Sequence, residues 1–144
     1  RGMAGGQAID LASVGKQILR AELEYMHIHK TGALIRAAIL LGALAGKLDD
    51  VQMENLDHYG KCIGLLFQVV DDVLDATADT ATLGKTAGKD ADNNKPTYVS
   101  LIGLNESRAL ARELSEQAET ALSTFGEAAW HLRALNHYIV SRQF

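Results

Sequence analysis

Three aspartates stand inside an otherwise apolar stretch near the middle of this chain. Asp71, Asp72 and Asp75 follow the apolar residues 63–67 without a proline or a turn signal, and this pattern predicts a helix. On such a helix Asp71 and Asp75 share one face with Gln68. Asp72 lies at the rim of that face. Carboxylates on an apolar helix are costly to desolvate, so a cation should balance them, and their oxygen ligands favour a hard ion such as Mg²⁺.

An acidic helix edge exposed to water is the alternative interpretation of this motif. A lone D-D-x-x-D pattern is weak, because a solvated edge would produce it as well. Large apolar side chains surround the acids, and they make a fully wetted face unfavourable: Phe67, Val69, Val70, Val73 and Leu74. The metal site is therefore the favoured interpretation.

The remaining residues predict an all-α fold. The chain has one proline in 144 residues and no convincing strand pattern, and its length suits a single unit over residues 1–144. The expected helices cover residues 18–29, 33–45, 50–76, 97–102, 105–125 with an Asn105 N-cap, and 127–140. Thr31 and Gly32 are expected to interrupt the helical structure between the first two helices. Gly60 and Gly64, inside the third helix, predict the close approach of a neighbouring helix.

Several classes of protein are disfavoured by composition. The formal net charge of −4 argues against a general nucleic-acid surface, which is normally basic. The longest apolar stretch, residues 33–45, is interrupted by Arg36 and is too short to span a bilayer. The single cysteine, Cys62, excludes an internal disulfide, and with no visible signal peptide it favours the cytoplasm. Because the chain opens without an initiator Met, we expect a longer polypeptide.

Polar residues gather where the helices are expected to end. Lys30 and Thr31 stand at the expected break between two helices. A second group, which includes Lys85 and Lys95, lies in a loop expected over residues 77–96. In an antiparallel bundle these groups would meet the aspartates at the helix ends. Lysines would then hold phosphate oxygens directly and aspartates would hold them through Mg²⁺, which predicts a phosphorylated ligand.

Neither the loop nor the histidines predict a separate site. Residues 84–89 resemble a phosphate-binding loop but lack its spacing and a preceding strand. Residues 90–94 resemble a calcium loop but lack its glycine and its closing glutamate. The histidines show no ligand pairing, so packing or surface roles are expected for all of them: His27, His29, His58, His131 and His137.

Taken together, the ordered motifs resemble the second aspartate-rich region of the trans-prenyl diphosphate synthases. The matching residues are 67–75, 84–90 and 94–97, preceded in the same order and spacing by 5–10 and 29–32. The resemblance covers essentially the whole chain, and it points to bacterial short-chain enzymes of the farnesyl diphosphate synthase type. It implies an isoprenoid-synthase-type helical bundle around a central apolar cavity, of which this chain is the C-terminal half.

The resemblance also implies an activity. The family joins an allylic diphosphate (dimethylallyl or geranyl diphosphate) to isopentenyl diphosphate by ionisation, condensation and proton elimination, here to make farnesyl diphosphate. Asp71 would bind Mg²⁺ directly, and Asp72 and Asp75 would complete or orient its ligand shell. Lys30 and Lys85 would join these acids as catalytic residues.

Binding roles follow from the same resemblance. The implied substrate-binding residues are Lys30, Thr31, Gln68, Lys85, Lys95 and Arg142. The three lysines would bind the allylic diphosphate, while Arg142 would help to neutralise isopentenyl diphosphate. Thr31 and Gln68 would lie beside the bond that breaks, with oxygen dipoles turned toward the carbocation.

One part of the family pattern is absent from this sequence. The family carries a first aspartate-rich motif in its N-terminal half, and no second D-D-x-x-D occurs here. We therefore expect no turnover from this chain alone, and association with the missing half or as a homodimer. The alternatives are a class I terpene cyclase, whose second metal motif typically contains Asn, Ser and Glu, and a non-catalytic helical regulatory or assembly subunit. The D-D-x-x-D pattern weighs against the cyclase, and the intact Asp71, Asp75, Lys30 and Lys85 weigh against the non-catalytic subunit.

Overall fold

The computed structural model describes residues 2–77 and 95–142, and every element in these ranges is helical. The elements are α1 (Met3–Ser13), α2 (Arg20–His27), η1 (Ile28–Gly32), α3 (Ala33–Leu44), α4 (Asp50–Thr77), α7 (Tyr98–Ile102), α8 (Leu104–Ala121), η2 (Ser123–Ala129) and α9 (Trp130–Ser141). The expected all-α fold is confirmed.

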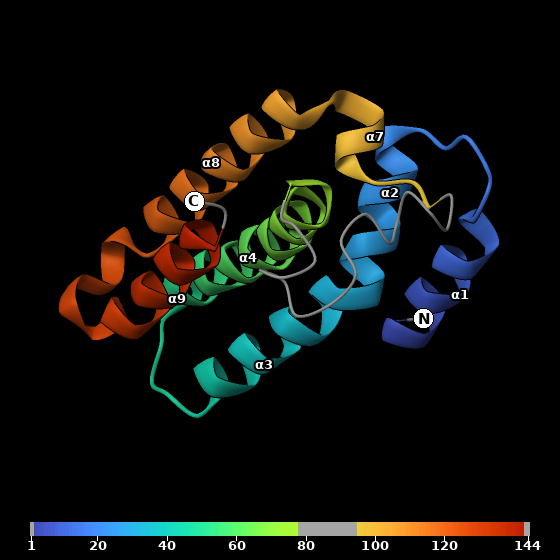
Figure 1. Ribbon diagram of the computed structural model, residues 1–144. Coiled ribbons are helices and arrows are strands. Elements are labelled where there is room, and N and C mark those ends of the chain that lie inside the picture. Colours follow the sequence, from blue (N-terminus) through green and yellow to red (C-terminus); the bar gives the residue numbers. More distant parts are fainter. Residues whose placement is uncertain (1, 78–94, 143–144) are drawn as a thin grey trace.

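Helix α4 is the centre of the molecule and carries the three aspartates near its end. It runs between α3 on one side and α8 with α9 on the other (Figure 1). Apolar residues recur along it at helical spacing, and Tyr59, Ile63, Leu66 and Val70 are at most 1% exposed. Burial on several faces fixes the direction of α4, so the acids at its end have a defined position.

The expected break at Thr31 and Gly32 is a π-helical turn, η1, that joins α2 to α3 without interruption. Glycines let two other helices touch this turn. A Cβ on Gly6 of α1 would overlap the backbone of Lys30, and a Cβ on Gly64 of α4 would lie 2.8 Å from the Cα of Gly32. The predicted close approach at Gly64 is confirmed, and η1 is held between α1 and α4. π-Turns of this kind are frequent at functional sites.

The C-terminal helices begin and end at other residues than expected. Helix α8 starts at Leu104 after Gly103, whose φ is +85°, so the prediction of Asn105 as N-cap is wrong. The helix stops at Ala121 instead of continuing to Phe125, and a 3₁₀ segment with Gly126 at φ +53° follows. The positive φ of Gly126 bends the chain within this segment, which continues to Ala129, so the last helix starts at Trp130 and not at Glu127.

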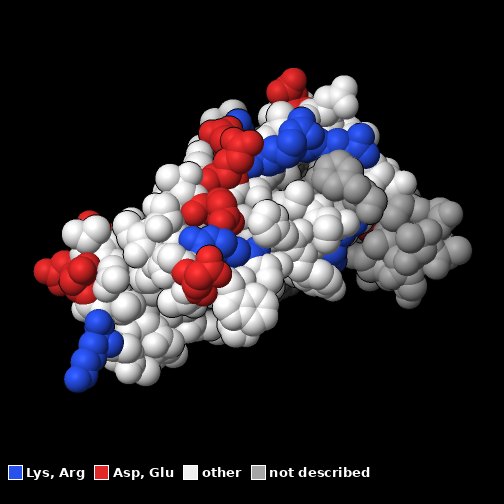
Figure 2. All heavy atoms as spheres, turned by 90° about the vertical axis from the view of Figure 1, so that its left-hand side faces the viewer, with Lys and Arg blue, Asp and Glu red and all other residues white. Residues whose placement is uncertain are grey.

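Several large apolar side chains are exposed on the surface. Leu34, Leu41 and Leu44 of α3 are 65%, 69% and 70% exposed, and Trp130 of α9 is 56% exposed. On the side shown in Figure 2, charged side chains of both signs adjoin one another in a band, with uncharged areas beside it. Within the described residues no helix is both long and apolar enough to cross a membrane. The exposed leucines of α3 form a surface suited to packing against another element.

Candidate functional site

The candidate site is a cavity of about 250 Å³ at the end of α4, which we call the polar cavity. Its lining comes from α1, from α2 with η1, from α4 and from the segment that leads into α7. The lining residues are Asp10, Met26, His27, Lys30, Gln68, Asp71, Asp72, Asp75, Lys95, Pro96 and Thr97. Helices distant in the sequence therefore meet here with acidic, basic and amide side chains.

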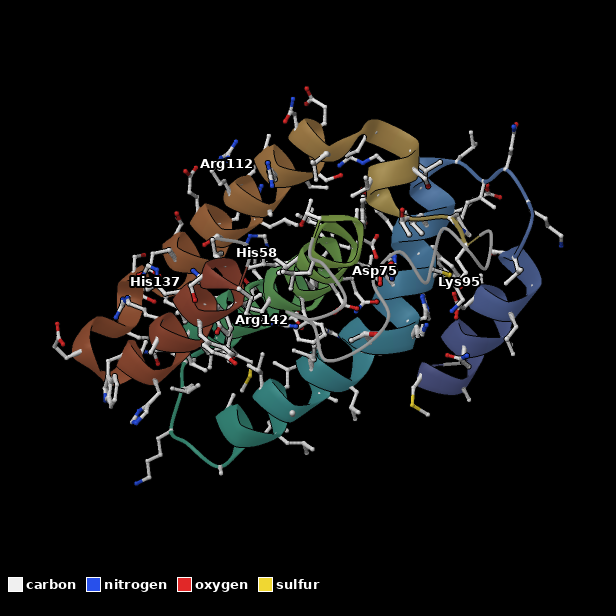
Figure 3. All side chains as sticks on the ribbon, in the orientation of Figure 1. His58, Asp75, Lys95, Arg112, His137 and Arg142 are labelled. Carbon is white, nitrogen blue, oxygen red and sulfur yellow. The ribbon has the colours of Figure 1, made fainter. Side chains whose placement is uncertain are left out.

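The polar cavity brings together most of the residues that the sequence singled out. These are Lys30, Gln68, Asp71, Asp72, Asp75 and Lys95. Figure 3 shows Asp75 and Lys95 on the same side of the molecule, with His58, Arg112 and His137 away from them. Thr31 is half-buried and is not part of the lining, while Lys85 lies outside the described residues.

The three aspartates have different surroundings. Asp72 is 7% exposed, and its Oδ2 accepts a hydrogen bond of 2.8 Å from the backbone N–H of Tyr98 at the start of α7. Asp75 is also buried, at 6% exposure, whereas the side chain of Asp71 is 39% exposed. Asp72 therefore anchors α7 to α4, and Asp71 is the acid most accessible to a ligand.

Arg142, in the C-cap position of α9, reaches the outer edge of this site. Its Nη2 lies 3.9 Å from Oδ1 of Asp71, and its guanidinium lies over the ring of Phe67 at 5.3 Å from the ring centroid. The predicted assignment of Arg142 to a substrate diphosphate stays a prediction. The observed contacts are an ion pair with an acid of α4 and a cation–π contact.

Sequence reasoning missed Asp10, which is 4% exposed and carries the buried negative charge beside the lysines. The Nζ of Lys30 donates to its Oδ2 across 2.8 Å, and the Nζ of Lys95 lies 3.7 Å from the same oxygen. Asp10 follows Gly6 by one helical turn, so both residues share the face of α1 that packs on η1. That spacing, a glycine one turn before an acid, is the signal that could have found it.

Sequence reasoning also missed His27, for which a packing or surface role was the only expectation. Its Nδ1 lies 2.8 Å from Oε1 of Gln68, and its ring stacks on Tyr98 with centroids 5.6 Å apart. Burial lowers the pKa of His27 to about 4, so the ring is neutral near pH ~7. Its place one turn before Lys30 does not distinguish it from the other histidines. The protonation of His27 is decided by burial, and burial depends on the tertiary structure.

The donor set suits a cation that arrives with an anionic ligand. Within residues 2–77 and 95–142, no three His, Cys, Asp or Glu side chains come close enough together to hold a metal ion by themselves. Mg²⁺ is usually bound through one or two carboxylates, with phosphate oxygens and water completing its shell. Asp71 and Asp75, one helical turn apart on the polar cavity, can supply those carboxylates, while Lys30 and Lys95 can bind the phosphate oxygens.

Comparisons with known proteins agree with this chemistry. Residues 1–130 match the family model described as polyprenyl synthetase. The chain is 48% identical to the farnesyl diphosphate synthase of Escherichia coli, over 98% of this chain and 48% of that protein. It is 46% identical to the chloroplastic geranylgeranyl pyrophosphate synthase of Catharanthus roseus, over 98% of this chain and 40% of the relative.

Solved structures of prenyl synthases are also similar to this chain. A geranyltransferase of Helicobacter pylori complexed with magnesium and isoprenyl diphosphate superimposes with a TM-score of 0.79 at 31% identity, over 97% of this chain and 46% of that one. An FPP/GFPP synthase of Zymomonas mobilis superimposes with a TM-score of 0.82 at 36% identity, over 96% and 45% of the two chains. The chain thus spans about half the length of the relatives that it matches.

Proposed function

This chain belongs to the polyprenyl synthetase family, and we propose that it is the C-terminal half of a farnesyl diphosphate synthase-type prenyltransferase. In this proposal the complete protein joins an allylic diphosphate to isopentenyl diphosphate, and this half binds the allylic diphosphate. The observation that carries the proposal is the polar cavity, where two lysines face the aspartates of α4 across a space of about 250 Å³. A surface acidic edge would not place two half-buried lysines in the same cavity as its carboxylates.

The charges of the cavity suit a diphosphate group. Lys30 and Lys95 enter from one side, and their ammonium groups are compact donors for phosphate oxygens. Asp71 and Asp75 enter from α4, and we propose that they hold the diphosphate through Mg²⁺. Mg²⁺ would supply charge that stabilises the departing diphosphate. Asp72 is proposed to act indirectly, because its carboxylate already accepts from the backbone of Tyr98.

Breaking the carbon–oxygen bond of an allylic diphosphate leaves a carbocation and an anionic leaving group. Lysines already positioned at the leaving group stabilise the negative charge as it develops, without first having to move. Close packing around α4, where Leu66, Val69, Val70 and Val73 are fully buried, supports exclusion of water from the neighbourhood of the cation. The departing diphosphate is a sufficient base for the final proton elimination, so the proposal requires no strong base from the protein.

Because the chain spans only about half the length of its relatives, the proposal includes a second half. We propose that a preceding half supplies the first aspartate-rich motif and most contacts to isopentenyl diphosphate, and that it covers the apolar surface of α3. The exposed Leu34, Leu41 and Leu44 support such a partner, since a monomer rarely leaves a row of leucines in water. A homodimer of the complete protein and the farnesyl chain length belong to the same proposal.

Calorimetry on this chain tests the proposed binding role. We expect inorganic diphosphate to bind when Mg²⁺ is present and binding to be lost in Asp71→Ala. The matched control is Asp50→Ala, which removes the same charge at the opposite end of α4 and should bind as the unmodified chain does. Equal loss in both variants, or diphosphate binding that ignores Mg²⁺, would contradict the proposal. Prenyl transfer itself is expected after addition of the preceding half and not before.

A further inference from the structure

His27 and Gln68 form a partly buried contact in which a ring nitrogen faces the carboxamide oxygen. Nδ1 of His27 lies 2.8 Å from Oε1 of Gln68, and His27 is 6% exposed. A carboxamide oxygen accepts hydrogen bonds and donates none, so with the Gln68 amide placed as it is here, Nδ1 carries the proton. Because burial keeps this imidazole neutral, the proton at Nδ1 leaves Nε2 bare.

The other ring nitrogen supports the same arrangement. Nε2 of His27 is buried and has no hydrogen-bond partner among the described residues. In the observed arrangement this atom is an unpaired acceptor. If the amide of Gln68 donated to Nδ1 instead, Nε2 would carry a hydrogen and become an unpaired buried donor, which is the rarer and costlier defect. The contact therefore favours His27 as donor and the oxygen of Gln68 as acceptor.

This orientation decides which end of the Gln68 amide remains for a ligand. The oxygen is occupied by His27, while the side chain lines the polar cavity together with Lys30 and Lys95. We propose that His27 is a positioning residue, which holds the carboxamide of Gln68 so that its NH₂ group serves the polar cavity as a donor to an anionic ligand. This differs from the expectation that Gln68 turns its oxygen toward a carbocation. The identity of the anion, a diphosphate, rests on the proposed function.

The surroundings of His27 keep it in this position. Its ring stacks on Tyr98 at an interplanar angle of 19°, and the backbone N–H of Tyr98 is bound by Asp72. The imidazole therefore has a fixed platform on one face and Gln68 at its edge. Because the His27 ring is held in this way, it can hold the carboxamide of Gln68 in one orientation. A free carboxamide would instead lose side-chain entropy on binding a ligand.

A crossed pair of variants separates this role from simple packing. His27→Phe keeps an aromatic ring against Tyr98 and removes the donor. His27→Asn removes the ring and keeps a donor, because the amide nitrogen of Asn lies about where Nδ1 of the imidazole lies. His29→Phe is the matched control: His29 lies on the same turn, and its Nδ1 contacts the backbone oxygen of Tyr25 outside the polar cavity.

Two quantities are measured for each variant. Calorimetry gives the dissociation constant of inorganic diphosphate in the presence of Mg²⁺, and thermal melting gives the stability. We expect His27→Phe to weaken binding roughly tenfold, and His27→Asn to stay within about threefold of the unmodified chain. Thermal stability should follow the opposite order, since Phe fills the buried space and Asn does not. The proposal would be overturned if the affinity for diphosphate ranked the variants as thermal stability does, with His27→Phe close to the unmodified chain and His27→Asn weaker.

Nuclear magnetic resonance of the ligand-free chain decides the proton position directly. Two-bond proton–nitrogen correlations of His27 should show a protonated Nδ1 and a bare Nε2 at pH ~7. A proton on Nε2 would overturn the proposal. If the unmodified chain binds no diphosphate, the proposed function fails, and this measurement still decides the orientation of Gln68 by itself.

Discussion

Lys30 and Asp10 form an ion pair of 2.8 Å between two helical elements, although twenty positions separate them in the chain. Asp10 is 4% exposed, and the same oxygen lies 3.7 Å from the Nζ of Lys95. A buried carboxylate therefore holds the two lysines that the proposed function assigns to a diphosphate. The contact exists because Gly6 lets α1 approach the backbone of Lys30.

The first prediction concerns the strength of this pair between a half-buried lysine and a buried carboxylate. Lys30→Met removes a partner from a buried carboxylate and should lower the free energy of unfolding by about 2 kcal/mol. Adding Asp10→Asn should recover part of that loss, which gives a coupling energy of about 1–2 kcal/mol in a double-mutant cycle. Urea unfolding of the four proteins measures the cycle.

The control for this cycle is the pair of Asp57 and Lys61, two side chains one turn apart on α4 at 2.7 Å. The side chain of Lys61 is 60% exposed, so water screens the pair and its coupling should stay below about 1 kcal/mol. Equal couplings in the two cycles would show that burial adds nothing at Asp10.

The second prediction concerns the contact between α1 and η1. Gly6→Ala places a Cβ against the backbone of Lys30, which cannot rotate away as a side chain can. We expect it to lower the free energy of unfolding by about 1–3 kcal/mol or more. Gly5→Ala is the matched control, because nothing outside its own helix backbone lies within 4 Å of its Cβ position, and it should be neutral or gain up to about 1 kcal/mol. Thermal melting compares the two, and similar melting temperatures would refute the predicted contact.

The third prediction separates two neighbouring aspartates. Asp72→Ala leaves the backbone N–H of Tyr98 without its acceptor and should cost about 1–3 kcal/mol of stability. Asp71→Ala removes a partly exposed side chain and should change stability by no more than about 0.5 kcal/mol, although we expect it to abolish diphosphate binding with Mg²⁺. Thermal melting and calorimetry of both variants make the comparison. A strongly destabilised Asp71→Ala would place Asp71 in a structural role instead.

The fourth prediction concerns pH. Burial lowers the pKa of His27 from 6.5 to about 4, with Lys30 adding to the decrease and Gln68 and Asp10 opposing it. The unfolded chain therefore binds a proton before the folded chain does as the pH falls. The stabilisation from neutral His27 is fully present above pH ~6.5 and is lost progressively toward pH ~4, by roughly 3 kcal/mol over the whole interval.

His27→Phe supplies the comparison for this pH dependence. The variant has no proton to gain at this position, so its free energy of unfolding should fall less between pH ~7 and pH ~5. Urea unfolding at those two values measures the difference. Parallel pH profiles for the two proteins would mean that His27 titrates alike in the folded and unfolded chains.

Local patterns along the chain were sufficient to predict the helices from residue 18 onward and several members of the site, but not α1. Helical spacing of apolar residues predicted α4, and the acids within it predicted Asp71 and Asp75 on one face. Turn chemistry at the C-terminal end was harder to foresee, because whether Gly126 bends the chain depends on the packing of its neighbours. Helix boundaries there were consequently misplaced.

The sequence by itself determined the helical class and which acids and lysines the chain has available, since periodicity and side-chain chemistry are local properties. Tertiary structure alone decided that Asp10 meets Lys30, that Asp72 anchors α7 while Asp71 stays accessible, and that His27 is neutral and bound to Gln68. The physical reason is that ion pairing, desolvation and amide orientation depend on which helices touch. Those contacts depend on glycines such as Gly6 and Gly64, whose partners lie far away in the chain.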